Sequence, residues 1–109
     1  MAKLETIIRN EDFNELLSRI QNGIMGGSIS ASLEDYSDFS DGHSRVSVRV
    51  FERYSWLGGN RVSLSVTLYQ PAPGEIRVSA IASGGSQALF YKINTFGEEA
   101  FLDKLREIL

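Results

Sequence analysis

The stretch Arg61-Val62-Ser63-Leu64-Ser65-Val66-Thr67-Leu68 alternates strictly between polar and apolar side chains. Side chains of a β-strand point alternately to opposite faces, so this period of two predicts a strand with one face on a core and the other turned outward. Strands of parallel sheets are buried on both faces and lack such clean alternation. The stretch therefore predicts an amphipathic antiparallel sheet at the centre of the fold.

The same alternation recurs on both sides of this stretch, in residues 28–34, 45–50 and 76–83. Residues 3–9 are partly β-branched and predict an N-terminal strand. Residues 57–59 are expected to form a three-residue hairpin loop with Gly59 in the left-handed conformation. This loop places Val50 opposite Val66, so that the even-numbered residues of both strands share the core face.

A second hairpin is predicted further along the chain. Ser83-Gly84-Gly85-Ser86 has the composition of a two-residue turn, because Gly-Gly meets the positive φ that such turns need. The strand after this turn would run through residues 89–93 and place Tyr91 opposite Val78.

Two segments have the helical period instead. Asn10 is expected to be the N-cap of a helix whose apolar stripe consists of Phe13, Leu16, Leu17, Ile20 and Ile24. Thr95 and Glu98 have the spacing of a capping box, which predicts the start of a second helix. The stripe of that helix consists of Phe101, Leu102, Leu105, Ile108 and Leu109.

Together these segments predict a single α+β domain over residues 1–109. We expect an antiparallel sheet of five to six strands with two helices packed on one face, in the order β-α-β-β-β-β-β-α. This order resembles a shortened helix-grip arrangement, the folds of which hold apolar ligands between a curved sheet and a C-terminal helix. The resemblance is one of topology and implies no function.

Composition narrows the classes of protein that fit. The chain is 42% hydrophobic and 23% charged, as is usual for one globular domain, and it has no cysteine. Disulfides, thiol nucleophiles and thiolate metal sites are thereby excluded, which fits a cytoplasmic location. No apolar run has a signal peptide's pattern or approaches the ~20 residues of a membrane span.

Charge is distributed unevenly along the chain. Residues 45–92 carry six cations against two carboxylates, a balance of +4, whereas the whole chain has a net charge of −3. Alternation places most of these cations on the outward face of the sheet, beside aromatic side chains. The predicted binding residues of this face are Arg49, Phe51, Arg53, Tyr69, Arg77, Phe90 and Lys92, joined by Arg45, Arg61 and Ile81.

This basic, aromatic face suits an acidic protein surface, including the helices of a second copy of the chain. Cations interleaved with aromatics also occur in proteins that bind single-stranded nucleic acid, but the net charge of −3 disfavours that class. A solvated face with scattered arginines remains open. We expect a non-enzymatic interaction module that forms a homodimer or binds a protein partner.

The alternative is a small-ligand binder or minimal enzyme with a cavity between the sheet and the helices. Alternation points Glu52 toward the core, where a carboxylate lining a cavity would have a raised pKa. Tyr54, Trp56 and Tyr91 would lie nearby. Glu52 can instead lie beyond the core or be turned outward by a bulge.

Other chemistry is weakly indicated. Residues 83–87 can form an anion-binding nest, but they lack the lysine and following helix of a phosphate loop. Residues 35–42 are expected to form a loop, in which Asp35, Asp38 and Asp41 do not have the spacing of a calcium loop, and His43 is the only histidine. We predict no catalytic residue, metal or cofactor.

Two glycine-bearing segments resemble a known family. They are Glu52–Leu64 and Gly84–Lys92, the latter running into Asn94–Glu99. Together they resemble a small family of bacterial proteins of unknown function. The resemblance implies an uncharacterised bacterial domain and brings no activity, ligand or catalytic residue.

Overall fold

The computed structural model describes residues 1–55, 60–84 and 91–109. Five strands and two helices follow one another in these residues in the order β-α-β-β-β-β-α. They are β1 (Ala2–Arg9), α1 (Phe13–Gly26), β2 (Ser32–Asp41), β3 (Ser44–Ser55), β4 (Asn60–Ala72), β5 (Glu75–Gly84) and α2 (Tyr91–Ile108). The predicted α+β class is confirmed, although the predicted order contained one strand more.

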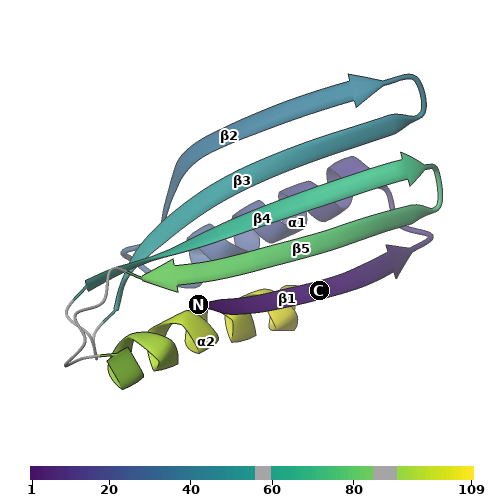
Figure 1. Cartoon of the computed structure of the whole chain (residues 1–109). Coiled ribbons are helices and arrows are strands. Elements are labelled where there is room, and N and C mark those ends of the chain that lie inside the picture. Colours follow the sequence, from purple (N-terminus) through teal and green to yellow (C-terminus); the bar gives the residue numbers. More distant parts are fainter. Residues whose placement is uncertain (56–59, 85–90) are drawn as a thin grey trace.

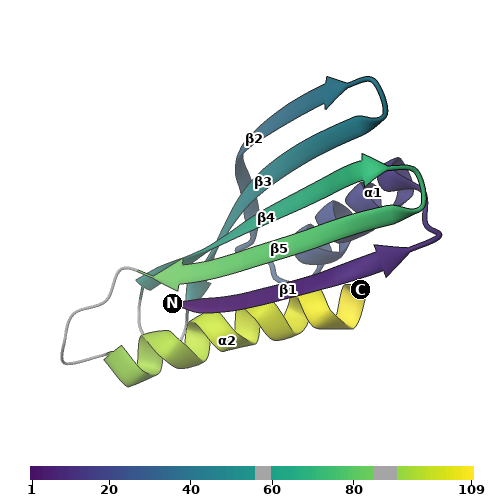
Figure 2. The same cartoon turned by 45° about the vertical axis from the view of Figure 1, so that its right-hand side comes forward.

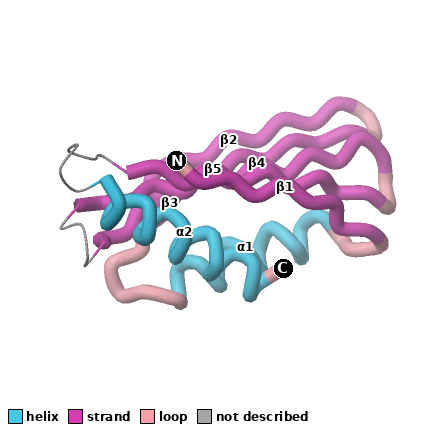
Figure 3. The backbone as a smooth tube through the Cα atoms, turned by 60° about the horizontal axis from the view of Figure 1, so that its bottom comes forward, coloured by secondary structure: helices cyan, strands magenta, loops and turns pink. Residues whose placement is uncertain are grey.

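The strands form one antiparallel sheet in the order β1-β5-β4-β3-β2, so that β1 and β2 are its edges (Figures 1 and 2). Both helices lie on the same side of this sheet, and no described element covers the other side (Figure 3). The helices run antiparallel, since Gly23 of α1 approaches Ile108 while Gly27 approaches Lys104.

The core lies between the sheet and the two helices. Its buried apolar side chains come from the predicted stripes of both helices and from the even-numbered residues of β4 and β5, together with Ala2 and Phe51. Phe13, Leu16, Ile20 and Ile24 contribute from α1, and Phe101, Leu102 and Leu105 from α2. Within the described residues, neither helix combines the length and apolar character needed to cross a membrane.

The predicted strand through residues 89–93 is wrong for residues 91–93, which the structure describes. Tyr91 and Ile93 lie in α2, whereas residues 85–90 lie outside the described residues. β1 occupies the edge of β5 that the predicted strand needed, with Thr6 opposite Val78. Since that edge is taken, the apolar residues after the glycines continue as a helix, which also places the predicted N-cap Thr95 inside α2.

The predicted pairing of β3 with β4 is wrong by one residue. Phe51 lies opposite Leu64, and Val50 lies opposite Ser65 rather than Val66. A shift of one residue turns over the whole strand, so the odd-numbered residues of β3 face the helices. The physical reason lies in the size of the buried groups: Phe51 is completely buried, and its ring removes more apolar area from water than a valine side chain does.

The predicted three-residue loop at 57–59 is also not supported by the pairing beside it. Ser55 pairs with Asn60, so four residues separate the paired ends of β3 and β4. Residues 56–59 themselves lie outside the described residues.

The start of α1 and the extent of β2 differ from expectation as well. Asp12, not Asn10, is the N-cap, and its carboxylate accepts a hydrogen bond of 3.0 Å from the Glu15 amide. Asn10 instead has a positive φ of 60° and donates its N–H to the Gly74 carbonyl at 3.1 Å. β2 continues through the predicted aspartate-rich loop to a two-residue turn, in which Gly42 has a φ of 61°.

Candidate functional site on the open face of the sheet

The side of the sheet that carries no helix is called the open face here. It is formed on each strand by the residues that alternate with the helix-facing ones. These are Lys3, Glu5, Ile7 and Arg9 of β1; Glu75, Arg77, Ser79, Ile81 and Ser83 of β5; Arg61, Ser63, Ser65, Thr67 and Tyr69 of β4; Ser44, Val46, Val48, Val50, Glu52 and Tyr54 of β3; and Ser32, Asp35, Ser37, Phe39 and Asp41 of β2. Hydroxyl and β-branched side chains predominate in its middle.

One row of side chains crosses the whole open face. The pairing registers place Ile7 opposite Arg77, Arg77 opposite Tyr69, Tyr69 opposite Val46 and Val46 opposite Phe39. Four of these five side chains are apolar or aromatic. Ile7 is 45% exposed and Phe39 is 69% exposed, so the apolar row is accessible from one sheet edge to the other.

A shallow hollow lies at the β1 end of this row. Its volume is about 610 Å³, and it is open to solvent on one side. The side chains around it come from three adjacent strands, β1, β5 and β4, and include Ile7, Tyr69 and Arg77. The hollow is therefore part of the open face and not a cavity between sheet and helices.

The charges of the open face are balanced locally. The register places Lys3, Arg9, Arg61 and Arg77 there, together with the carboxylates of Glu5, Asp35, Asp41, Glu52 and Glu75. Arg61 lies 2.8 Å from Glu52, Arg77 lies 2.8 Å from Glu75, and Lys3 lies 2.9 Å from Glu5. The hydrogen bond from Arg77 lowers the pKa of Glu75 from its usual value.

Two arginines of β3, Arg45 and Arg53, lie on the side of the sheet that faces the helices and cover the edge of the core. The Arg45 guanidinium lies 4.0 Å from the centre of the Phe13 ring, and that of Arg53 lies 4.5 Å from the centre of the Phe101 ring. Cations over ring faces are attracted by the aromatic quadrupole while their aliphatic stems cover apolar surface. These two arginines therefore belong to the packing between sheet and helices.

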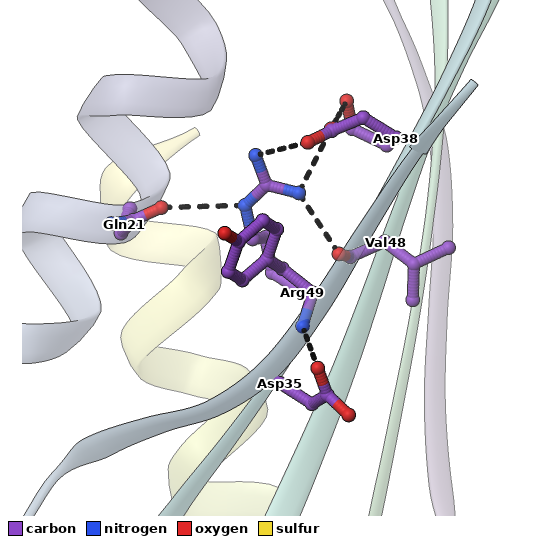
Figure 4. Close-up of polar contacts among 7 residues, drawn as sticks. Gln21, Asp35, Asp38, Val48 and Arg49 are labelled. Carbon is purple, nitrogen blue, oxygen red and sulfur yellow. Dashed lines mark hydrogen bonds and ion pairs between the residues drawn. The ribbon is translucent and has the colours of Figure 1, made fainter.

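Arg49 joins three elements on the helix side (Figure 4). Its guanidinium donates to both carboxylate oxygens of Asp38 on β2, at 3.0 and 3.3 Å, and to the Gln21 side chain of α1 at 3.4 Å. The Ser47 hydroxyl donates to the same carboxylate at 2.6 Å. The hydrogen bond from Ser47 and then that from Arg49 lower the pKa of Asp38 from its usual value of 3.8.

The sequence as a whole was compared with known families. Residues 1–109 match DUF6054, a family of unknown function. The chain belongs to this family. The resemblance found in the glycine-bearing segments is thereby confirmed as one to a family of unknown function, and bacterial origin stays a prediction. No curated protein and no solved structure matches this DUF6054 member.

The predicted binding face of this DUF6054 member needs correction. Arg49, Phe51 and Arg53 face the helices, because the register of β3 is shifted by one residue. Tyr69 and Arg77 do lie on the open face. Phe90 and the side chain of Lys92 lie outside the described residues. The open face is consequently mixed in polarity, with locally balanced charges and one mainly apolar row, rather than basic.

The predicted cavity residues do not converge. Glu52 and Tyr54 lie on the open face, where Glu52 pairs with Arg61, so neither points into the core. Trp56 and the side chain of Tyr91 lie outside the described residues. The prediction that Glu52 points toward the core was wrong because the one-residue shift in register turns over the whole of β3.

The weaker candidates are dispersed. Asp35 and Asp38 lie on opposite faces of β2, and Asp41 lies at the turn that contains His43. Within residues 1–55, 60–84 and 91–109, no group of three or more potential metal-ligating side chains comes together. Ser83 and Gly84 belong to β5, whereas the rest of the predicted nest lies outside the described residues.

Several open-face residues were missed by sequence reasoning. The predicted loop over residues 35–42 contains Phe39, although the segment from Asp35 to Asp41 has neither glycine nor proline and is compatible with a strand. Val46, Val48 and Val50 were assigned to the core, and they lie half-buried on the open face. Only the pairing with β4 reveals their orientation.

Proposed function

We propose that this chain is a non-enzymatic protein-interaction module that associates with a second copy of itself through the open face. The observation that carries the proposal is the exposed row from Ile7 through Tyr69 and Val46 to Phe39. Exposed apolar side chains that are scattered singly are ordinary, but a row of four apolar or aromatic side chains, interrupted only by Arg77, on a sheet face that no described element covers is typical of an interaction surface. We place this activity in the cytoplasm, in keeping with the absence of cysteine.

The charge of the open face supports an identical partner. Its lysine and arginines are neutralised by carboxylates of the same face, as in the pairs Arg61–Glu52 and Arg77–Glu75. Such a face offers no strong net field to a highly charged partner, which also argues against nucleic acid. Face-to-face packing of two sheets buries β-branched, hydroxyl and aromatic side chains of this kind.

Edge-to-edge association through β2 is disfavoured by charge. This strand carries Glu34, Asp35, Asp38 and Asp41, which a second β2 edge would repel. Charged side chains on an edge strand are a common means of preventing strand pairing between molecules. The open face is therefore a better surface for self-association than the β2 edge.

The proposal is tested by sedimentation velocity over a concentration series, with native mass spectrometry as a second measurement. Ile81 on the open face and Met25 on α1 are similarly exposed, at 39% and 37%. We expect a reversible dimer that is lost in Ile81→Glu and retained in Met25→Glu, since only the first places a new carboxylate in the interface. Circular dichroism checks that both variants remain folded.

A wild-type protein that stays monomeric at the highest concentration would refute the proposal. Equal dimerisation of Ile81→Glu and Met25→Glu would also refute it, because the association would then involve a different surface. Dimer loss in Met25→Glu alone would point to the helix layer instead.

A further inference from the structure

We propose that the two copies pack face to face about a two-fold axis parallel to β4, with Phe39 of each copy seated in the hollow beside Ile7 of the other. This arrangement rests on the proposed self-association and specifies its geometry. It follows from the order of the strands, the position of the hollow and the distribution of charge on the open face.

The position of the axis follows from strand order. β4 is the middle strand of five, so a two-fold axis along it, lying between the two sheets, places β2 of one copy over β1 of the other. Ile7 and Phe39 are the two ends of the same cross-strand row. The rotation therefore brings each Phe39 over the partner's Ile7 without displacement along the strands.

The shapes at the two ends of the row are complementary. At the β2 end, Phe39 projects with 69% of its surface exposed. At the β1 end lies the hollow of about 610 Å³ that Ile7, Tyr69 and Arg77 help to line. An aromatic ring in this hollow would contact the isoleucine and lie near the Arg77 guanidinium, a contact that an aromatic face favours. The aromatic anchor and its receptor are thus present on the same surface, as an isologous interface requires.

The charges favour the same axis over the perpendicular one. On the open face, β1 and β5 carry Lys3, Arg9 and Arg77 against Glu5 and Glu75, a balance of +1. β3 and β2 carry Glu52, Asp35 and Asp41 there, a balance of −3, with Glu34 at the β2 bulge beside them. An axis along β4 places each half over the half of opposite sign. An axis across the strands would place like over like, which costs energy.

The area is sufficient for a reversible dimer. Four spacings of about 4.8 Å between five strands, and eight paired residues of β1 at about 3.4 Å each, give a flat area of about 500 Å² per copy. Two copies would bury about 1,000 Å², which is at the lower end of specific interfaces. We therefore expect a dissociable dimer whose affinity depends strongly on its anchor.

The geometry is tested by cross-linking single-cysteine variants, which is straightforward because the natural chain has no cysteine. Because both substitutions alter the anchor, the dimer Kd of Phe39→Cys and of Ile7→Cys is first measured by sedimentation, and all reactions are run at concentrations above these values. The two variants are then mixed and treated with a bismaleimide whose span matches the ~10 Å between packed sheets. We expect the 39–7 cross-link to form at least about tenfold faster in the mixture than same-residue cross-links form in either variant alone. Within one chain the two positions are about 19 Å apart, too far for this linker.

The anchor is tested by comparing two exposed aromatics of the same strand. Phe39 and Tyr36 of β2 are 69% and 63% exposed but lie on opposite faces. Phe39→Ala should raise the dimer Kd by at least about tenfold, as truncation of a buried aromatic anchor does, while Tyr36→Ala should leave it within about twofold.

Each outcome of the cross-linking decides between geometries. Fast 39–39 and 7–7 cross-links would overturn the axis along β4 in favour of the perpendicular one. A dimer in sedimentation without any of these cross-links would overturn the face-to-face geometry while leaving self-association standing. A monomer at all concentrations would refute both the geometry and the proposed function. An unchanged Kd in Phe39→Ala would remove Phe39 as the anchor.

Discussion

Phe51 of β3 lies directly opposite Leu64 of β4, and neither side chain has any surface exposed to solvent. This pair determines which side of β3 faces the helices. It places Arg49 and Arg53 over the core edge and Val50 on the open face. The surface available to a partner therefore depends on which residues of two neighbouring strands are paired.

Phe51→Ala is expected to destabilise the fold by about 3–5 kcal/mol, because it removes a buried ring and leaves a cavity. Val50→Ala, one residue earlier on the open face, should cost far less, since that side chain is only half-buried. Urea denaturation followed by circular dichroism measures both. A larger loss in Val50→Ala would mean that the predicted even-numbered register was correct after all.

Arg49→Met is expected to lower the free energy of unfolding by about 1–3 kcal/mol, the usual value of hydrogen bonds to a charged group. The methionine retains an apolar stem but cannot donate to Asp38, Gln21 or the Val48 carbonyl. Arg61→Met is the matched control, because the Arg61–Glu52 pair is largely exposed and should contribute no more than about 1 kcal/mol. Similar losses in both variants would show that Arg49 acts only as a surface charge.

The pH dependence of stability is expected to report on Asp38. Its folded pKa is lowered, so its ionised form stabilises the fold above the unfolded pKa, and this contribution is lost as the pH falls below about 3.8 toward the folded value. The stability difference between wild type and Asp38→Asn should therefore be largest near neutral pH and shrink on acidification. Equilibrium denaturation at several pH values measures it, and a difference that grows on acidification would contradict the assignment.

The cause of that lowered pKa can be separated by a second variant. The hydrogen bond from Ser47 contributes most to the shift and that from Arg49 comes next. Ser47→Ala should therefore bring the pKa of Asp38 closer to its usual value while leaving the pair with Arg49 in place. NMR titration of the Asp38 carboxylate measures the change. An unchanged pKa would assign the whole effect to Arg49.

Gly23→Ala is expected to destabilise the protein, whereas Gly26→Ala should stabilise it by up to about 1 kcal/mol through helix propensity. A Cβ at position 23 would approach the Ile108 side chain to 2.5 Å, while a Cβ at position 26 would contact nothing within 4 Å. Ile108→Ala removes the side chain that the new Cβ would meet. Gly23→Ala should therefore lower the melting temperature less in the Ile108→Ala background than in the wild type. Thermal denaturation of the four variants measures this coupling, and a gain in Gly23→Ala equal to that in Gly26→Ala would contradict it.

Periodicity correctly predicted those segments in which the pattern of apolar residues allows only one face to be buried. The stripe from Phe13 to Ile24 has apolar residues only at helical spacing, and α1 forms there. In β4 and β5 the apolar residues of the alternation lie on one side except Tyr69 and Ile81, and the residues of that side are buried. A local pattern is sufficient in such segments because the alternative orientation would expose most of the apolar side chains.

Prediction failed where two solutions were close in energy. In β3 one face carries Val46, Val48 and Val50, and the other carries Phe51 with arginines whose stems also cover apolar surface. Alternation alone cannot rank these faces, so the predicted binding face contained four residues that face the helices, Arg45, Arg49, Phe51 and Arg53. The open-face row was missed for a further reason. It combines one residue from each of five strands, and no pattern along the chain shows that these residues are neighbours.

The sequence by itself determined the class of the fold, the two amphipathic helices, the inward faces of β4 and β5 and the membership of a family of unknown function. Only the tertiary structure decided which face of β3 is buried, that β1 takes the edge of β5, and hence which side chains form the open face. The division has a physical cause. Periodicity arises from neighbours along the chain, whereas the register and order of strands depend on the packing of side chains that are distant in sequence.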